Sequence, residues 1–157
     1  MGALNMETFA FILLRIVFAW MFLWPIKSLL ADWKATQSMV AMLCPASLVG
    51  IGSIGMVLLM VVGSFSILLG ILPQVGGLLL AIFCLFGAYI HYRLGASAAE
   101  GALSQSVTRA DRNLHAKAVG LAAVGNITSA EKNIVLAAVG IFFALVGTGP
   151  YSLCAGF

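Results

Sequence analysis

The stretch that decides the fold is residues 48–72, LVGIGSIGMVLLMVVGSFSILLGIL, which holds no charged side chain. A helix rises about 1.5 Å per residue, so a run of this length can cross a hydrocarbon core of about 30 Å. Within lipid, backbone N–H and C=O groups find no water to bond, and a helix satisfies them inside the segment. We therefore predict a membrane-spanning helix here.

The rest of the chain has the same apolar character. Of its 157 residues, 62% are hydrophobic and 8% are charged, whereas a soluble domain carries about 25% charged residues. A water-soluble globule and a disordered chain are both excluded. Three further apolar runs cover residues 8–30, 75–92 and 133–149. We predict an all-α bundle of four transmembrane helices, forming a single integral membrane domain over residues 1–157.

A polar connector, residues 94–130, separates the third and fourth predicted spans. Apolar side chains recur in it at spacings of three and four residues, as on one face of a helix. They are Leu103, Val107, Ala110, Leu114, Ala118 and Leu121. This pattern predicts an amphipathic surface helix between helices three and four, lying on the membrane or against a partner subunit. A solvated helix packed on its own bundle fits the pattern equally well.

Positive charge is distributed unevenly over the predicted loops. With four spans, the loop after the first span and the connector share one side, and that side, counted with the adjoining span ends, holds seven of the eight Lys and Arg residues. The seven are Lys27, Lys34, Arg93, Arg109, Arg112, Lys117 and Lys132. The positive-inside rule therefore predicts that the connector 94–130 is cytoplasmic and that both termini are external.

Small residues recur at helical spacing within the predicted spans, which favours close approach of helix backbones in lipid. In the third span they are Gly77, Ala81, Cys84 and Ala88, and in the fourth Ala137, Gly140, Ala144 and Gly147. The pattern predicts a compact bundle with little internal volume for a large cofactor.

Arg15 is the one ionisable residue well inside a predicted span. Its charge needs oxygen acceptors within the membrane. We predict that it lies near residues 147–152, where the fourth helix releases carbonyl groups and Tyr151 offers a hydroxyl. Snorkelling to a lipid phosphate and contact with a quinone oxygen are the other interpretations. His91, at the end of the third span, is a further candidate for contact with quinone or lipid.

No set of residues has the spacing of a metal site or a catalytic centre. Cys44, Cys84 and Cys154 are far apart and form no CxxC pair, so we interpret them as packing residues. His115 lies in the polar connector, which disfavours a haem held by two histidines. We predict no catalytic residue, no metal and no cofactor of the chain's own. All five acidic residues lie outside the spans, which weighs against a proton-coupled transporter.

Four short motifs resemble the DoxX/DoxD-like family of small four-helix bacterial membrane proteins. They are LLRI at 13–16, WPIK at 24–27, GSFSILLG at 63–70 and GTGPYSL at 147–153. The last is similar to the family's closing Gly-x-Gly-x-Tyr-Ser-Leu-Asp, with Cys154 in place of the acid. A carboxylate often found in the family's second helix has no counterpart in residues 48–72. The resemblance therefore does not imply, for this chain, any chemistry that uses these two acids.

The resemblance implies an accessory subunit of a respiratory or quinone-linked oxidoreductase complex in the bacterial inner membrane. Its role would be anchoring, packing or the binding of quinone or phospholipid, with contacts from Arg15, Tyr151 and His91. The expected partners are membrane lipids and other subunits of a membrane complex, without nucleic acid. Two alternatives stay open: the quinone-binding component of an enzyme similar to thiosulfate:quinone oxidoreductases, and a small-solute transporter.

Overall fold

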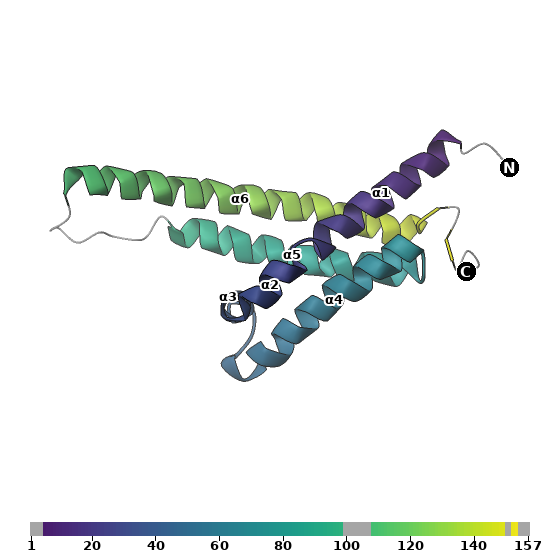
Figure 1. Ribbon diagram of the computed structural model, residues 1–157, viewed down its shortest axis with the longest axis horizontal. Helices are drawn as coiled ribbons and strands as arrows, with labels where there is room; N and C mark the ends of the chain where they lie inside the picture. Colours follow the sequence, from purple (N-terminus) through teal and green to yellow (C-terminus); the bar gives the residue numbers. More distant parts are fainter. Residues whose placement is uncertain (1–4, 99–107, 150–151, 154–157) are drawn as a thin grey trace.

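The computed structural model describes residues 5–98, 108–149 and 152–153, and every regular element in them is helical (Figure 1). In chain order the elements are α1 (Met6–Leu23), α2 (Ile26–Ala31), α3 (Trp33–Val40), η1 (Ala46–Leu48), α4 (Val49–Leu69), α5 (Pro73–Ala98) and α6 (Arg109–Val146). Within the described residues, four helical segments are long and apolar enough to cross a membrane. The predicted all-α architecture with four spans is therefore confirmed.

The observed span limits differ from the predicted ones by a few residues or more. The candidate spans are Met6–Ala31, Ala46–Leu69, Pro73–Ala98 and a part of Arg109–Val146. The first is broken after Leu23 because Pro25 lacks a backbone N–H and cannot continue the helical hydrogen bonding. The second ends at Leu69 because Gly70 adopts a left-handed conformation (φ 67°).

The turn between α4 and α5 is held by the hydroxyl of Ser66. Ser66 Oγ lies 2.6 Å from the carbonyl oxygen of Ile71 and 2.9 Å from that of Leu72. The carbonyl of Ile71 follows the end of α4, and that of Leu72 also accepts from the N–H groups of Val75 (3.0 Å) and Gly76 (3.1 Å) at the start of α5. Leu72 itself has a positive φ of 48°, which is uncommon for a residue other than glycine. The side-chain hydrogen bonds thus stabilise a tight and strained link.

The connector does not form a separate surface helix. Its described residues are 94–98, which end α5, and 108–130, which open α6 and run without a break into the fourth span. Leu103 and Val107 of the predicted face lie outside the described residues. Thr108 caps the start of α6 by accepting from the N–H of Asp111, 3.2 Å away. At about 1.5 Å per residue, the helix is about 57 Å long and extends well beyond a hydrocarbon core of about 30 Å. The predicted amphipathic surface helix is therefore corrected to an extension of α6.

The apolar face predicted for the connector is not packed against α5. Leu114 and Leu121 are 69% and 74% exposed. The residues of α6 that approach α5 lie on another face and include Ala123, Asn126 and Ile127, which lie beside Gly95. Of the interpretations above, packing of the Leu114–Leu121 face on the chain's own bundle is therefore wrong for the described residues.

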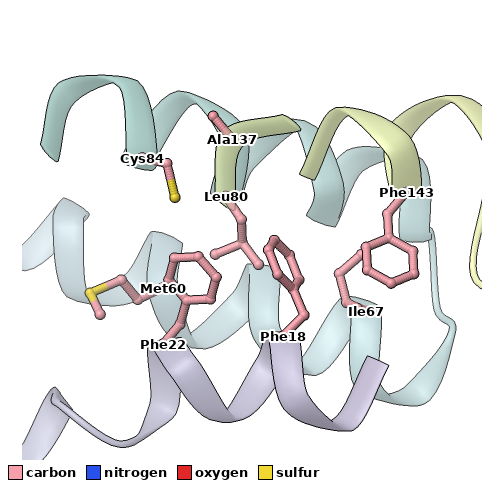
Figure 2. Packing of buried hydrophobic residues seen from close by; sticks show 8 residues of the cluster. All are labelled: Phe18, Phe22, Met60, Ile67, Leu80, Cys84, Ala137 and Phe143. Carbon is pink, nitrogen blue, oxygen red and sulfur yellow. The ribbon is translucent and has the colours of Figure 1, made fainter. Parts of the chain in front are cut away.

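The core lies where α1, α4, α5 and α6 meet (Figure 2). Its buried members are Phe18, Phe22, Met60, Ile67, Leu80, Cys84, Ala137 and Phe143. Phe18 contacts both Phe22 and Phe143, with ring centroids 5.1 and 5.5 Å apart. Cys84 is fully buried in this cluster, in agreement with its interpretation as a packing residue.

The helices α5 and α6 lie side by side and antiparallel (Figure 1). Their closest approach is at Gly77 and Gly140, both buried. A Cβ added at Gly77 would lie 2.5 Å from the carbonyl oxygen of Gly140. The predicted small-residue faces of the third and fourth spans are thus the faces that meet.

Candidate functional site

Arg15 is held by the C-terminal turn of α4. It is 6% exposed, and it donates from Nε to the carbonyl oxygen of Ile67 (3.1 Å) and from Nη2 to that of Leu68 (2.6 Å). Both carbonyls belong to the last turn of a helix, where the regular donors four residues on are missing and the helix dipole favours a cation; that of Ile67 also accepts from the N–H of Gly70 (3.3 Å). Arg15 thus fastens α1 to α4.

The segment after α6 packs against the same end of α4. The N–H of Leu153 donates to the carbonyl oxygen of Leu69 (3.1 Å), and the side chain of Ser152 lies against Gly70. This segment also touches α1, but through Phe11, whose ring lies beside Gly149 and is 5.9 Å from the ring of Phe142.

The structure therefore agrees only in part with the surroundings predicted for Arg15. The helix whose end supplies the carbonyls of Ile67 and Leu68 is α4, not the fourth span. Ser152, Leu153 and Arg15 thus all contact the end of α4 or the glycine that follows it. Tyr151, the third residue of the predicted site, lies outside the described residues.

His91 lies far from Arg15, toward the other end of the bundle. It is eighteen residues beyond Pro73, or about 27 Å along α5. Its Nδ1 is 3.0 Å from Oδ1 of Asn126, whose Nδ2 donates to the carbonyl oxygen of Ala122 (2.9 Å). Since the amide oxygen can only accept, Nδ1 carries the proton, and Nε2 of the neutral ring is an acceptor. The two predicted contact residues thus do not form one site.

A cavity of about 640 Å³ occupies the end of the bundle where His91 lies. It lies where α4 and α5, joined closely by residues 70–72, diverge from each other (Figure 1). Its volume is within the range of about 300–1,000 Å³ that is typical of small-molecule sites. The cavity is partly open to the surroundings, because the small residues bring α5 and α6 together but leave the N-terminal half of α4 apart. The expectation of little volume inside the bundle stays a prediction.

The walls of the cavity are mostly apolar. Side chains from α1, α2, α3, α4 and α5 line it. They include four methionines, Met21, Met39, Met56 and Met60, and the aromatic and aliphatic residues Phe22, Leu29, Leu59, Phe83, Phe86 and Ile90. Methionine side chains are flexible and polarisable, and they adapt to ligands of irregular shape. Gly52 and Gly55 of α4 also line the cavity, and nothing lies within 4 Å of a Cβ added at Gly55.

One wall of the cavity is polar. It consists of His91 from α5 and Ser129, Lys132 and Asn133 from α6. The hydroxyl of Ser129 donates to the carbonyl oxygen of Gly125 (2.8 Å), so its donor is already used. Lys132 and Asn133 therefore supply the donors, and His91 supplies an acceptor. An apolar chamber with a few polar groups on one side suits an amphipathic ligand.

Sequence reasoning found His91 but missed the rest of this wall. From the sequence, Lys132 is predicted only as one of the seven basic residues on the cytoplasmic side, and Asn133 only as the first residue of the predicted span 133–149. The sequence does contain one signal for the cavity, the order Gly52-Ser53-Ile54-Gly55-Met56. Its two glycines leave one face of the second span without side chains. Its meaning depends on which face turns inward, and one sequence does not supply that orientation.

Within the described residues, no group of three or more His, Cys, Asp or Glu side chains could hold a metal ion. Cys44 lines the cavity, and its thiol donates to the carbonyl oxygen of Val40 (3.4 Å). The polar wall is therefore a hydrogen-bonding surface.

No family model, curated protein or solved structure matches this chain. The resemblance to DoxX/DoxD-like proteins stays a prediction from the motifs at 13–16, 24–27, 63–70 and 147–153. The candidate site therefore depends on the geometry of the cavity alone.

Proposed function

We propose that this multi-pass membrane protein is an accessory subunit of a respiratory or quinone-linked oxidoreductase complex, without a redox centre of its own. Its cavity holds a membrane amphipath, either an isoprenoid quinone or a phospholipid. The observation that carries the proposal is the 640 Å³ cavity with apolar walls and donors at one side. The four family-like motifs support the link to quinone-dependent complexes.

The orientation belongs to the same proposal. The protein lies in a bacterial inner membrane with residues 94–130 in the cytoplasm and both termini outside. The uneven placement of Lys and Arg supports this. The cavity lies toward the end of the bundle where α5 ends and α6 enters the membrane. In this orientation it faces the cytoplasmic leaflet.

A second candidate function is a catalytic one, as the quinone-binding component of an enzyme similar to thiosulfate:quinone oxidoreductases. The donors at Lys132 and Asn133 favour it, because quinone oxygens need hydrogen-bond donors as they take up charge. His91 suits this role less well than predicted. With Nδ1–H directed to Asn126, the neutral ring offers an acceptor to a quinol hydroxyl and no donor to a quinone carbonyl.

The test fills the cavity from α4. Gly55→Leu places a side chain in open space within the cavity, whereas Gly50→Leu adds the same side chain on the same helix, away from the cavity and without a neighbour within 4 Å. Quinone and phospholipid are extracted from each purified protein and quantified by mass spectrometry. We expect Gly55→Leu to reduce the bound amphipath by at least about tenfold, because a leucine displaces several methylene groups of the ligand.

Gly50→Leu should keep the wild-type content of quinone and phospholipid. If both variants keep that content, the cavity is not the binding site. Co-purification in mild detergent tests the accessory role separately. Migration of the wild type only as a single 16.5 kDa species, without other subunits, would contradict membership in a complex.

A further inference from the structure

The polar wall of the cavity carries a positive charge that no carboxylate among the described residues balances. Lys132 lines the cavity, and the described lining residues include no Asp or Glu. Nor does Lys132 have a carboxylate partner within the described part of the chain. Lys132 is itself exposed, and an ammonium that lines a mostly apolar cavity favours an anionic group on the ligand.

Asn133, the next residue, adds a neutral donor at the same wall. It is partly buried, and its side chain lies against Gly87 of α5, with Nδ2 3.2 Å from a Cβ added there. Gly87 thus leaves room for this amide beside the cavity. Lys132 and Asn133 together present an ammonium and an amide N–H to one head group, and both bind phosphate oxygens well.

His91, the third of these polar residues, offers a hydrogen-bond acceptor, whereas Lys132 and Asn133 offer donors. Because Nδ1 donates to Asn126, Nε2 of the neutral ring accepts. A head group that joins a phosphate to a free hydroxyl would use all three residues, the phosphate with Lys132 and Asn133 and the hydroxyl with His91. A quinone has neutral carbonyl oxygens, which leave the charge of Lys132 without compensation.

We infer that the ligand of this cavity is an anionic phospholipid, with its phosphate at Lys132 and Asn133 and an acyl chain along the methionine-lined wall. The inference rests on the proposed binding function and chooses between the two amphipaths named there. The apolar lining, which includes Met21, Met39, Met56 and Met60, offers an acyl chain apolar contact.

The test compares two lipids with the same acyl chains. Delipidated protein is incubated with vesicles of palmitoyl-oleoyl phosphatidylglycerol or phosphatidylcholine, and retained lipid is counted by native mass spectrometry. We expect the wild type to retain phosphatidylglycerol over phosphatidylcholine. Lys132→Gln should lower phosphatidylglycerol retention by about tenfold and leave phosphatidylcholine unchanged, because it removes one charge-assisted contact.

Lys117→Gln is the matched control, since it removes the same charge from an exposed position of α6 outside the cavity. Equal retention of the two lipids by the wild type, or an unchanged Lys132→Gln, would overturn the inference. Displacement of phosphatidylglycerol by inorganic phosphate alone would also overturn it, because the acyl chain would then contribute nothing. If Gly55→Leu loses its ligand while Lys132→Gln does not, the head-group assignment fails and the binding function stands.

Discussion

Arg15 carries a permanent charge into the first span, and its position is explained by where α4 ends. A guanidinium has five N–H donors and no acceptor, so in an apolar bundle it must find oxygen. The free carbonyls of a helix end are such acceptors, and Gly70 ends α4 just after Ile67 and Leu68. The residue therefore acts in the structure as a clamp between two helices.

Replacing this clamp should weaken the bundle. We expect Arg15→Leu to lower the free energy of unfolding by about 1–3 kcal/mol, since it removes the two hydrogen bonds that Arg15 donates to helix-end carbonyls. Arg15→Lys should recover only part, because an ammonium lacks the planar fork. Unfolding by sodium dodecyl sulfate, followed by circular dichroism, measures both. Lys117→Leu, at an exposed position, should change little, and an Arg15→Leu protein as stable as wild type would exclude the clamp.

The need of Arg15 for acceptors could be predicted from the sequence, but their identity could not. Two helix ends, at Gly70 and at Gly147, offer free carbonyls at the same side of the membrane. The choice between them depends on how α1 leans across the bundle, which is set by contacts far apart in the chain, such as that between Phe18 and Phe143. The motif at 147–153 indicated the correct end of the bundle for Arg15, but it did not indicate the helix that supplies the acceptors.

The antiparallel pair of α5 and α6 depends on backbone contact at two glycines. At Gly77 an added Cβ would lie 2.5 Å from the carbonyl oxygen of Gly140 and 2.7 Å from the backbone nitrogen of Ala144. Backbone atoms cannot rotate away as the end of a side chain can. In lipid, where close packing drives helix association, the separation of these two helices would have to increase.

We therefore expect Gly77→Ala to destabilise the bundle by about 1–3 kcal/mol, the usual effect of overpacking. Gly125→Ala is the matched control on α6, because nothing lies within 4 Å of its added Cβ. It should be neutral or stabilising by up to about 1 kcal/mol, since alanine is the better helix former. Thermal unfolding in detergent reports both. Equal effects of the two substitutions would show that the close approach does not matter.

The continuity of α6 is the element that sequence reasoning missed. Residues 128–131 have the spacing of an N-terminal capping box, and Glu131 and Lys132 suggest a boundary. In the structure Ser129 Oγ instead donates to the carbonyl oxygen of Gly125, within the same helix. No proline interrupts residues 109–146, so nothing forces the chain to turn. Capping residues indicate a helix start only where the preceding segment cannot itself be helical.

The two ends of the molecule differ in packing. At one end α4 closes tightly, with Arg15, Ser66 and Leu153 bound to its last residues or to the turn that follows. At the other end α4 and α5 diverge, the cavity opens, and α6 continues beyond the bundle (Figure 1). Stability is thus concentrated at one end, and the capacity to bind is concentrated at the other.

This asymmetry gives the orientation of the protein a clear test. Lys117 lies on the α6 extension and Met6 opens α1 at the opposite end of the bundle; both are exposed. In a variant with Cys44, Cys84 and Cys154 replaced by alanine, Lys117→Cys and Met6→Cys are each labelled in intact cells. The positive-inside rule predicts that a membrane-impermeant maleimide labels the Met6→Cys protein only, and that a permeant one labels both.

The same experiment bears on the lipid inference. The extension carries Arg109, Arg112 and Lys117, and such residues near a cytoplasmic surface are attracted to anionic lipid. If Lys117→Cys were labelled from outside, both the orientation and the leaflet assigned to the cavity would reverse. The cavity would then draw its phospholipid from the outer leaflet. Labelling restricted to the permeant reagent would instead place Lys132 in the leaflet that faces the cytoplasm, the side where anionic lipids hold positive charge most strongly.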